Sequence, residues 1–224
     1  MVQARVMTYN ILGGRARAEV AEVVRAVAPD VLLANESPKT PLLWRWRCGQ
    51  LSEDWGMRYV AGGRSAGSNL LAASSRVRAN DTSAQRVAQP LFKPRRGIVS
   101  AQLEVGAASF GFVGVHLSLM PDSRRREVEL VIEAADALTG PVVVAGDLNE
   151  LPSGRSWQRL RRAGFDDAGR DSDLTFPSTA PEKRIDALLV RGAAQVRAHQ
   201  VPNLDPALLT SASDHLPVTA VLVL

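Results

Sequence analysis

The chain has 224 residues, of which 46% are hydrophobic, and its formal net charge is +4. The single cysteine, Cys48, excludes an internal disulfide, and no uninterrupted apolar run is long enough to cross a membrane. We therefore expect one domain over residues 1–224, in a monomeric cytoplasmic protein without stable membrane association. The basic excess favours polyanions or phosphate esters as partners, although a surface rich in solvated arginine would give the same composition.

Hydrophobic periodicity divides the chain into helices and strands. Val20, Val23 and Val27 recur at helical spacing, and Pro29-Asp30 ends that helix. The predicted helices are residues 17–28, a helix capped by Thr40-Pro41 that continues through Trp44 to Leu51, residues 122–138, and a helix capped by Ser153 that ends at Gly164. The predicted strands are residues 6–10, 31–36, 59–60, 70–73, 98–103, 108–117, 142–147, 185–190, 195–201 and 217–224.

Two parts of the chain share one order of elements. Residues 6–36 and 112–147 each read as strand, helix, strand, with a carboxylate where the second strand ends. This repetition predicts two packed, mainly antiparallel sheets flanked by helices, a four-layer α/β sandwich. Polar strand ends from both halves would then meet at one rim. Turn-rich composition predicts mobile loops at residues 62–68, 78–96, 166–183 and 202–213.

Carboxylates and amides follow the predicted strands where these end. Glu36 is an oxygen donor suited to Mg²⁺, although a surface pair with Lys39 would also explain it. Asp147 and Asn149 follow a run of valines and share one face of an extended segment, so both can hold the same water or phosphate. The alternative for this pair is an Asx turn that closes the strand.

Histidine occurs three times, as His116, His199 and His215, and two of the three lie at strand ends. His215 follows Asp214 and can act as a base or as a hydrogen-bond donor to phosphate. Asp186 begins a buried strand, where a carboxylate needs an imidazolium or a metal as its partner. The alternative for His116 is a core histidine with satisfied hydrogen bonds.

Six motifs together resemble the endonuclease/exonuclease/phosphatase superfamily, the group of deoxyribonuclease I and exonuclease III. No single motif is specific, but their order and spacing match that group over residues 6 to 218. The motifs are Met7-Thr8-Tyr9-Asn10-Ile11, Asn35-Glu36, Gly114-Val115-His116-Leu117, Gly146-Asp147-Leu148-Asn149, Arg184-Ile185-Asp186 and Ser213-Asp214-His215. The resemblance implies the four-layer sandwich and a divalent-metal-dependent phosphoesterase.

The resemblance also implies how the site holds metal and phosphate. Glu36 would be the principal Mg²⁺ ligand, with Mn²⁺ able to substitute, and Asn10 and Asp214 would assist in holding the metal. Asn10 and Asn149 would orient the phosphate or its attacking water.

The same resemblance implies roles for the remaining site residues. Asp147 would position or activate the nucleophile. His215, polarised by Asp186, would contact the scissile phosphate or act as the base. His116 would stabilise the phosphate or the leaving oxygen. Because every motif carboxylate and both motif histidines are present, we expect an active enzyme rather than a binding module.

Two departures from the superfamily pattern narrow the range of activities that we expect. The first motif continues as Asn10-Ile11-Leu12 rather than Asn-x-Asp, and His116 stands where exonuclease III relatives have Tyr, so repair at abasic sites is disfavoured. The second motif reads Asn35-Glu36 rather than Gln-Glu. The glutamate expected to bind metal is kept, but the amide side chain before it is shorter.

Two classes of substrate remain open. A nucleic-acid phosphodiester is favoured by the basic stretches Lys93-Pro94-Arg95-Arg96, where Arg96 is predicted to bind phosphate, and Arg124-Arg125-Arg126. The second stretch begins a predicted helix, where cations oppose the helix dipole unless an anion binds there. A small phosphate ester is favoured by the compact chain and its few aromatics. Trp44, Trp46 and Trp55 could line a pocket, but we expect them to pack the second helix.

Overall fold

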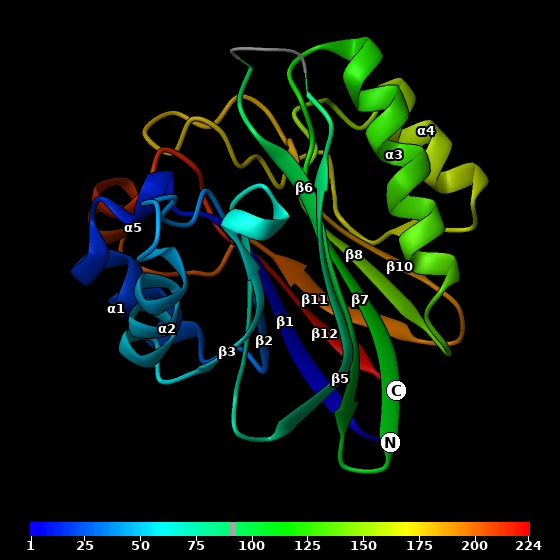
Figure 1. The fold of residues 1–224 in the computed structure, drawn as a ribbon, viewed down its shortest axis with the longest axis horizontal. Coiled ribbons are helices and arrows are strands. Elements are labelled where there is room, and N and C mark those ends of the chain that lie inside the picture. Colours follow the sequence, from blue (N-terminus) through cyan, green and yellow to red (C-terminus); the bar gives the residue numbers. More distant parts are fainter. Residues whose placement is uncertain (90–92) are drawn as a thin grey trace.

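Two six-stranded sheets pack face to face (Figure 1). The computed structural model describes residues 1–89 and 93–224. The first sheet has the order β11 (Gln195–Gln200), β12 (Val218–Val223), β1 (Gln3–Asn10), β2 (Val31–Asn35), β4 (Asn69–Ala73) and β3 (Arg58–Gly63). The second sheet has the order β5 (Val77–Val87), β6 (Arg96–Val105), β7 (Ala108–His116), β8 (Val142–Asp147), β10 (Asp186–Arg191) and β9 (Asp166–Asp167).

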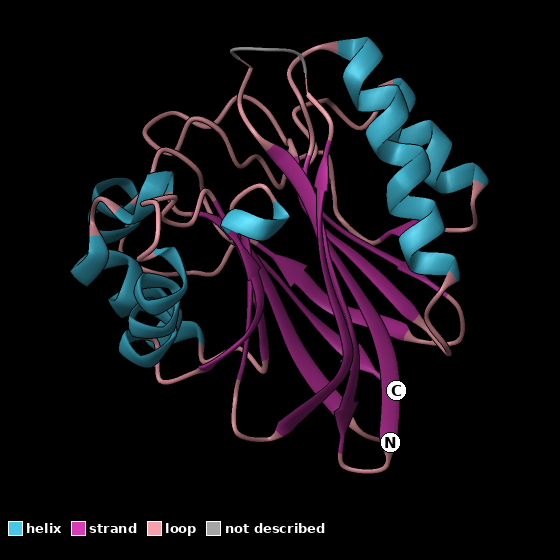
Figure 2. Cartoon of the chain, viewed as in Figure 1, coloured by secondary structure: helices cyan, strands magenta, loops and turns pink. Residues whose placement is uncertain are grey.

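Helices cover the outer face of each sheet, as the two helical groups on opposite sides of Figure 2 show. The first sheet is covered by α1 (Arg17–Val27), α2 (Trp44–Asp54) and α5 (Pro206–Ala212). The second sheet is covered by α3 (Pro121–Asp136) and α4 (Arg155–Arg162). Short 3₁₀ segments occur at η1 (Leu12–Gly14) and η2 (Arg64–Ala66). Within residues 1–89 and 93–224, no helix has the length and apolar character of a membrane span.

The central core lies between the two sheets and fixes how closely they approach. Leu33 of β2 and Val99 of β6 are fully buried there. A Cβ at Gly114 of β7 would lie 2.2 Å from Leu33 Cδ1, so the missing side chain lets the sheets pack at this distance. Two further cores lie under the helices, one on each outer face. The predicted four layers are therefore confirmed.

The predicted repetition between the two halves is also confirmed. β1 and β2 are parallel neighbours joined through α1, and β7 and β8 are parallel neighbours joined through α3. The other strand pairings in both sheets are antiparallel. Because parallel strands end at the same edge, Asn10 pairs in register with Asn35, and His116 pairs with Asp147. Each half thus delivers two polar residues to the rim.

Two of the predicted loops contain an α-helix or most of a long strand. Residues 78–96 were expected to form a loop, but most of that range forms β5, and residues 90–92 lie outside the described structure. β5 is an exposed edge strand, so its polar sequence lacks the apolar alternation of a half-buried strand. Residues 202–213 contain the short helix α5, which the side chain of Asp205 caps through the Ala207 N–H.

Two predicted helix caps are wrong. The fourth helix begins after Gly154 rather than Ser153, and the second begins at Trp44, three residues beyond Pro41. The hydroxyl of Thr40 accepts a hydrogen bond from Arg47 instead of capping the backbone.

Candidate active site

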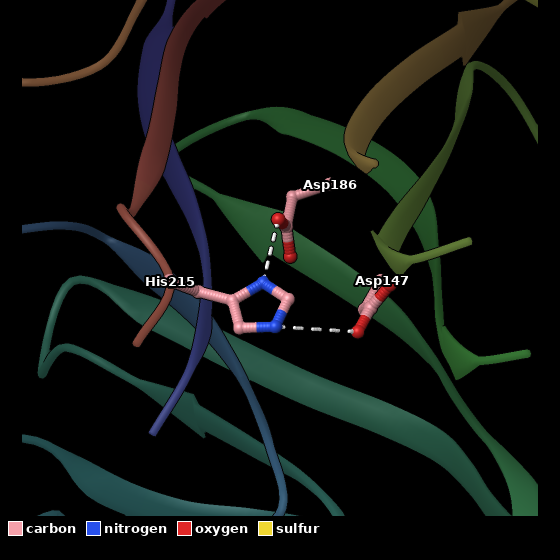
Figure 3. Close-up of side chains that lie close together, drawn as sticks. All are labelled: Asp147, Asp186 and His215. Atoms are coloured by element: carbon pink, nitrogen blue, oxygen red, sulfur yellow. Dashed lines mark hydrogen bonds and ion pairs between the residues drawn. The ribbon is translucent and has the colours of Figure 1, made fainter. Parts of the chain in front are cut away.

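The ends of β1 and β8, the start of β10 and the segment before β12 meet at the rim of the sandwich. His215 Nδ1 is hydrogen-bonded to Asp186 Oδ2 at 2.9 Å, and His215 Nε2 lies 3.8 Å from Asp147 Oδ2 (Figure 3). All three side chains are buried. One imidazole is therefore held between two carboxylates that come from adjacent strands of the second sheet.

Two further predicted site residues converge on the same oxygen of Asp147. Asn10 Nδ2 donates to Asp147 Oδ2 at 3.3 Å and lies 3.4 Å from His215 Nε2. His116 Nε2 lies 3.3 Å from Asp147 Oδ2, because β7 and β8 run side by side. Asn10 of β1, His116 of β7 and His215 of the loop before β12 thus surround Asp147 Oδ2 at the centre of the cluster.

Burial and the neighbouring charges shift the pKa values of these groups in different directions. Burial and the nearby Asp186 raise the pKa of Asp147 to about 7. Burial opposes the charged form of His215, but the carboxylate of Asp186 outweighs it and raises the pKa of His215 to about 9. Burial and the adjacent Arg96 hold the pKa of His116 well below its ordinary value. His215 is thus a cation at neutral pH, whereas His116 is neutral.

Backbone hydrogen bonds set the orientation of Asp147. Asp147 Oδ1 accepts from the N–H of Asn149 at 2.8 Å, which is the Asx turn considered from the sequence. Asn149 has φ +49° and donates through its side chain to Leu117 O at 2.8 Å. The N–H of Asp147 donates to Asn35 Oδ1 of the other sheet at 3.1 Å. The turn therefore leaves Asp147 Oδ2 facing the imidazoles.

The family follows from the sequence match. The sequence model of the Endonuclease/Exonuclease/phosphatase family matches residues 7–215, nearly the whole chain. The chain belongs to this family. Members of the endonuclease/exonuclease/phosphatase family are phosphoric ester hydrolases, both nucleases and phosphatases, so the protein is a phosphoesterase. No curated protein sequence matches the chain.

Solved structures of family members share the fold. An endonuclease/exonuclease/phosphatase from Bacteroides vulgatus has 18% identity and a TM-score of 0.79, with 100% of each chain covered. A mannosyl-6-phosphatase from Bacteroides thetaiotaomicron has 18% identity and a TM-score of 0.79, over 99% of this chain and 100% of that one. D. rerio TDP2, complexed with a single strand DNA product, has 14% identity and a TM-score of 0.73 over 100% of both chains.

The other two residues predicted to hold metal lie outside the buried cluster. Glu36 directly follows β2, with φ +60°, and is half-buried at the wall of a groove. Asp214 is half-buried, and its carboxylate accepts from the Ser213 hydroxyl at 3.4 Å. Within the described residues, no hydrogen bond joins either carboxylate to Asn10 or Asp147. Their roles as ligands stay predictions.

The donor set fits the divalent cation on which the endonuclease/exonuclease/phosphatase family generally depends. Asp147, Asp186 and His215 offer ligand atoms that all lie within 4.8 Å of one another. Asp186 Oδ1 is buried and has no hydrogen-bond partner among the described residues. The carboxylate oxygens of Asp147 and Asp186 are donors of the kind that suits Mg²⁺, whereas His215 can act as a ligand only in its neutral form.

The two basic stretches have different positions in this family member. Arg96 is buried, feels the charges of Asp147 and Glu36, and has a pKa that burial lowers. Its phosphate-binding role stays a prediction. Arg124, in contrast, donates to the carbonyls of Ser118 and Leu119, and to Glu150 at 3.2 Å. A bound anion is therefore not needed to explain that arginine at the start of α3, contrary to the possibility raised by the sequence.

Sequence reasoning named Asn35 in a motif without finding its contacts, and it missed Thr175 and Phe176. Asn35 Nδ2 donates to Asn69 Oδ1 at 2.8 Å and to Val115 O at 2.9 Å, which ties the two sheets together below the site. Thr175 Oγ1 accepts from the N–H groups of Ile185 and Asp186. The ring of Phe176 lies against His215, with centroids 4.8 Å apart. For Asn35, the one available signal was an amide that ends a fully buried strand and so needs partners.

Proposed function

We propose that the protein is a Mg²⁺-dependent phosphodiesterase that cleaves nucleic acid by in-line attack of an activated water. The observation that carries this proposal is the 2.9 Å hydrogen bond that His215 Nδ1 donates to Asp186 Oδ2, which directs the other ring nitrogen toward Asp147. Hydrolysis of a phosphate ester requires a base for the water and donors for the phosphoryl oxygens. The cluster supplies both kinds of group within one hydrogen-bonded network.

The chain's own residues divide these tasks. Asp147 accepts the proton of the attacking water at Oδ2, since Oδ1 is occupied by the Asn149 N–H. His215, whose pKa is raised to about 9, donates from Nε2 to a phosphoryl oxygen. Asn10 orients the phosphate beside His215 Nε2, and neutral His116 supports the Asp147 carboxylate or the leaving oxygen.

Mg²⁺ is assigned to Glu36, with Asn10 and Asp214 assisting. Glu36 is the one of these side chains that stands at a groove wall without a protein partner among the described residues, so its oxygens are available. When bound, the metal would supply positive charge to the phosphoryl oxygens and lower the pKa of a bound water. Mn²⁺, with similar oxygen ligands, is expected to substitute.

Nucleic acid is favoured as the substrate by charge. The net charge is +4, and Arg96 and Lys39 lie within electrostatic range of the cluster at His116. The similarity to TDP2, crystallised with a single strand DNA product, agrees with this class. A small phosphate ester is the second candidate, because a mannosyl-6-phosphatase matches 99% of the chain with a TM-score of 0.79, compared with 0.73 for TDP2.

Hydrolysis of three substrates side by side tests the proposal. Bis-p-nitrophenyl phosphate, p-nitrophenyl phosphate and a supercoiled plasmid are each incubated with Mg²⁺, Mn²⁺ or EDTA. We expect metal-dependent nicking of the plasmid, which Glu36→Gln abolishes and which EDTA stops. Glu22→Gln, an exposed glutamate on α1, is the matched control and should retain full activity.

Other outcomes would favour the second candidate function or contradict the metal assignment. Preference for p-nitrophenyl phosphate without nicking would favour the small-ester phosphatase. Hydrolysis that persists in EDTA, or in Glu36→Gln, would contradict the metal assignment.

A further inference from the structure

A groove of about 480 Å³ begins at the predicted metal ligand and extends along α2. Its walls are residues 13–14 after β1, residues 36–40 after β2, and Trp46, Arg47 and Gln50 of α2. The strands that precede these two loops carry Asn10 and Glu36 to the rim. The groove therefore adjoins the candidate active site, and a substrate bound there could extend into it.

The charged side chains of the groove favour an anion. Arg17, Lys39 and Arg47 face it, against one acid, Glu36. Arg17 is paired with Asp54, which leaves Lys39 and Arg47. Arg47 is exposed and is held in place by a 2.8 Å hydrogen bond to the Thr40 hydroxyl.

Lys39 connects the groove with the catalytic cluster. Burial lowers the pKa of Lys39, and Glu36 opposes that shift, so the ammonium and the carboxylate are close enough to interact. Lys39 also contributes, after burial, Arg96 and His215, to the lowered pKa of His116. Its positive charge therefore acts on Glu36 in the groove and on His116 in the cluster.

Trp46 distinguishes this groove from ordinary helix packing. Its side chain is 63% exposed, whereas Trp55 is buried and Trp44 is half-buried. The expectation that all three pack the second helix is thus wrong for Trp46. An exposed indole beside cations offers a flat apolar face next to phosphate donors, which is the combination that binds an unpaired base in a single-stranded nucleic acid.

The groove on the opposite flank lacks this combination. It lies between α3 and α4 and has a volume of about 400 Å³. Arg159 pairs with Glu129 at 2.7 Å and Arg125 lies 3.8 Å from Asp122, whereas Arg155 and Arg162 have no ion pair among the described residues. No aromatic side chain is among its described lining residues. The stacking surface therefore selects the α2 side.

We propose that the α2 groove binds the nucleotide adjacent to the scissile phosphate of a single-stranded nucleic acid. Trp46 stacks on its base, and Lys39 and Arg47 contact its phosphate. This inference rests on the proposed function and specifies its substrate. A duplex keeps its bases stacked inside and a phosphorylated sugar has no planar face, so neither would use Trp46.

Binding and cleavage of a labelled single strand of about 12 nucleotides test the inference. Dissociation constants are measured by anisotropy in EDTA, and kcat/KM is measured with Mg²⁺ on the oligonucleotide and on bis-p-nitrophenyl phosphate. We expect Trp46→Ala to weaken binding about tenfold, or about 1.4 kcal/mol, and to lower the ratio of the two kcat/KM values similarly. Trp46→Phe should restore most of the affinity.

Two arginines on the same helix provide a matched pair. Arg47→Ala should weaken binding and reduce the slope of log Kd against log salt by about one. Arg45→Ala, which removes an equally exposed charge outside the groove, should bind the oligonucleotide like the parent protein.

Three results would overturn the inference, and they separate it from the proposed function. If the parent protein cleaves the oligonucleotide but Trp46→Ala binds and cleaves equally well, the groove is wrong and the function stands. If the parent protein hydrolyses only small esters, both are wrong. If Trp46 is instead needed for binding vesicles of phosphatidylcholine and phosphatidylserine, the exposed Leu42, Leu43 and Trp46 form a membrane contact and the inference fails.

Discussion

Two buried ionic clusters lie on either side of Ile185, and they differ in how well their charges are paired. Arg184 donates two hydrogen bonds, of 3.0 and 2.8 Å, to Asp167, whose carboxylate also accepts from the Gly169 N–H and from Arg161. The guanidinium lies 4.9 Å above the ring of Trp157. This cluster pairs its charges and closes the strand edge at β9, and Arg184 Nε is its one buried nitrogen without a hydrogen-bond partner among the described residues.

The second cluster contains buried polar atoms without hydrogen-bond partners among the described residues. Asp186 and Asp147 share one imidazolium, and both Asp186 Oδ1 and His116 Nδ1 are buried without partners among the described residues. A buried carboxylate without a cationic partner of its own costs stability and persists where it serves a function. The comparison indicates that the Arg184 cluster stabilises the fold, and we propose that the Asp147 cluster is arranged to bind a divalent cation and a phosphate.

Replacing Asp147 should separate activity from stability most strongly. Asp147→Asn removes a buried charge next to Asp186 while keeping an oxygen for the Asn149 N–H. We expect kcat/KM for a phosphodiester to fall about a thousandfold, or about 4 kcal/mol, with an unchanged or higher Tm in EDTA. Paired kinetic and calorimetric measurements check this, and a large drop in Tm would show that Asp147 is structural.

Breaking the paired cluster should have the opposite effect. Arg184→Met leaves Asp167 buried with only the partly exposed Arg161 as a cationic neighbour at hydrogen-bond distance. We expect the free energy of unfolding in urea to fall by about 3 kcal/mol. Arg161→Met, which removes the more exposed partner, serves as the control and should cost less than about 1 kcal/mol. Equal losses in both variants would contradict the assigned roles.

The pH dependence of the free energy of unfolding should show the contribution of the Arg184–Asp167 pair. Burial raises the pKa of Asp167, but hydrogen bonds from Arg184 outweigh it and leave the pKa below its ordinary value. The pair therefore stabilises the protein above about pH 4, and this stabilisation is lost as the pH falls through the lower folded-state pKa. The stability difference between the parent and Asp167→Asn should shrink over that acidic range in denaturant titrations, whereas a constant difference would exclude the linkage.

Loosening the packing around His215 should have the smallest effect. Phe176→Leu removes the ring that lies against the imidazole at 4.8 Å. We expect kcat/KM to fall about fivefold and the free energy of unfolding to change by about 1 kcal/mol or less. Phe176→Tyr should retain most of the activity. A loss as large as that of Asp147→Asn would mean that Phe176 contacts substrate.

Periodicity predicted the fold where burial is regular. The apolar residues of β1, β2 and β8 and the apolar stripe of α1 are buried as expected. β5 was missed because an exposed edge strand carries no apolar alternation. α5 was missed because it is short and reads as a turn-rich segment.

The candidate site was predictable where a polar side chain ends a strand. Asn10, His116 and Asp147 each end a strand, and the fold brings them together. Asn35 also ends a strand, but its role and that of Phe176 could not be found this way, because they depend on contacts with the opposite sheet and with a distant loop. Motif spacing identifies groups that react, whereas tertiary contacts determine those that hold them in position.

The thermal shift on adding Mg²⁺ to the EDTA-treated protein tests the central claim most directly, because a cation that binds the folded chain must raise its Tm. If the Asp147 cluster and Glu36 are arranged for a divalent cation, Tm will rise saturably with Mg²⁺ in the parent protein and in Glu22→Gln, and will not rise in Glu36→Gln. No shift in the parent protein, or an equal shift in Glu36→Gln, would contradict the account.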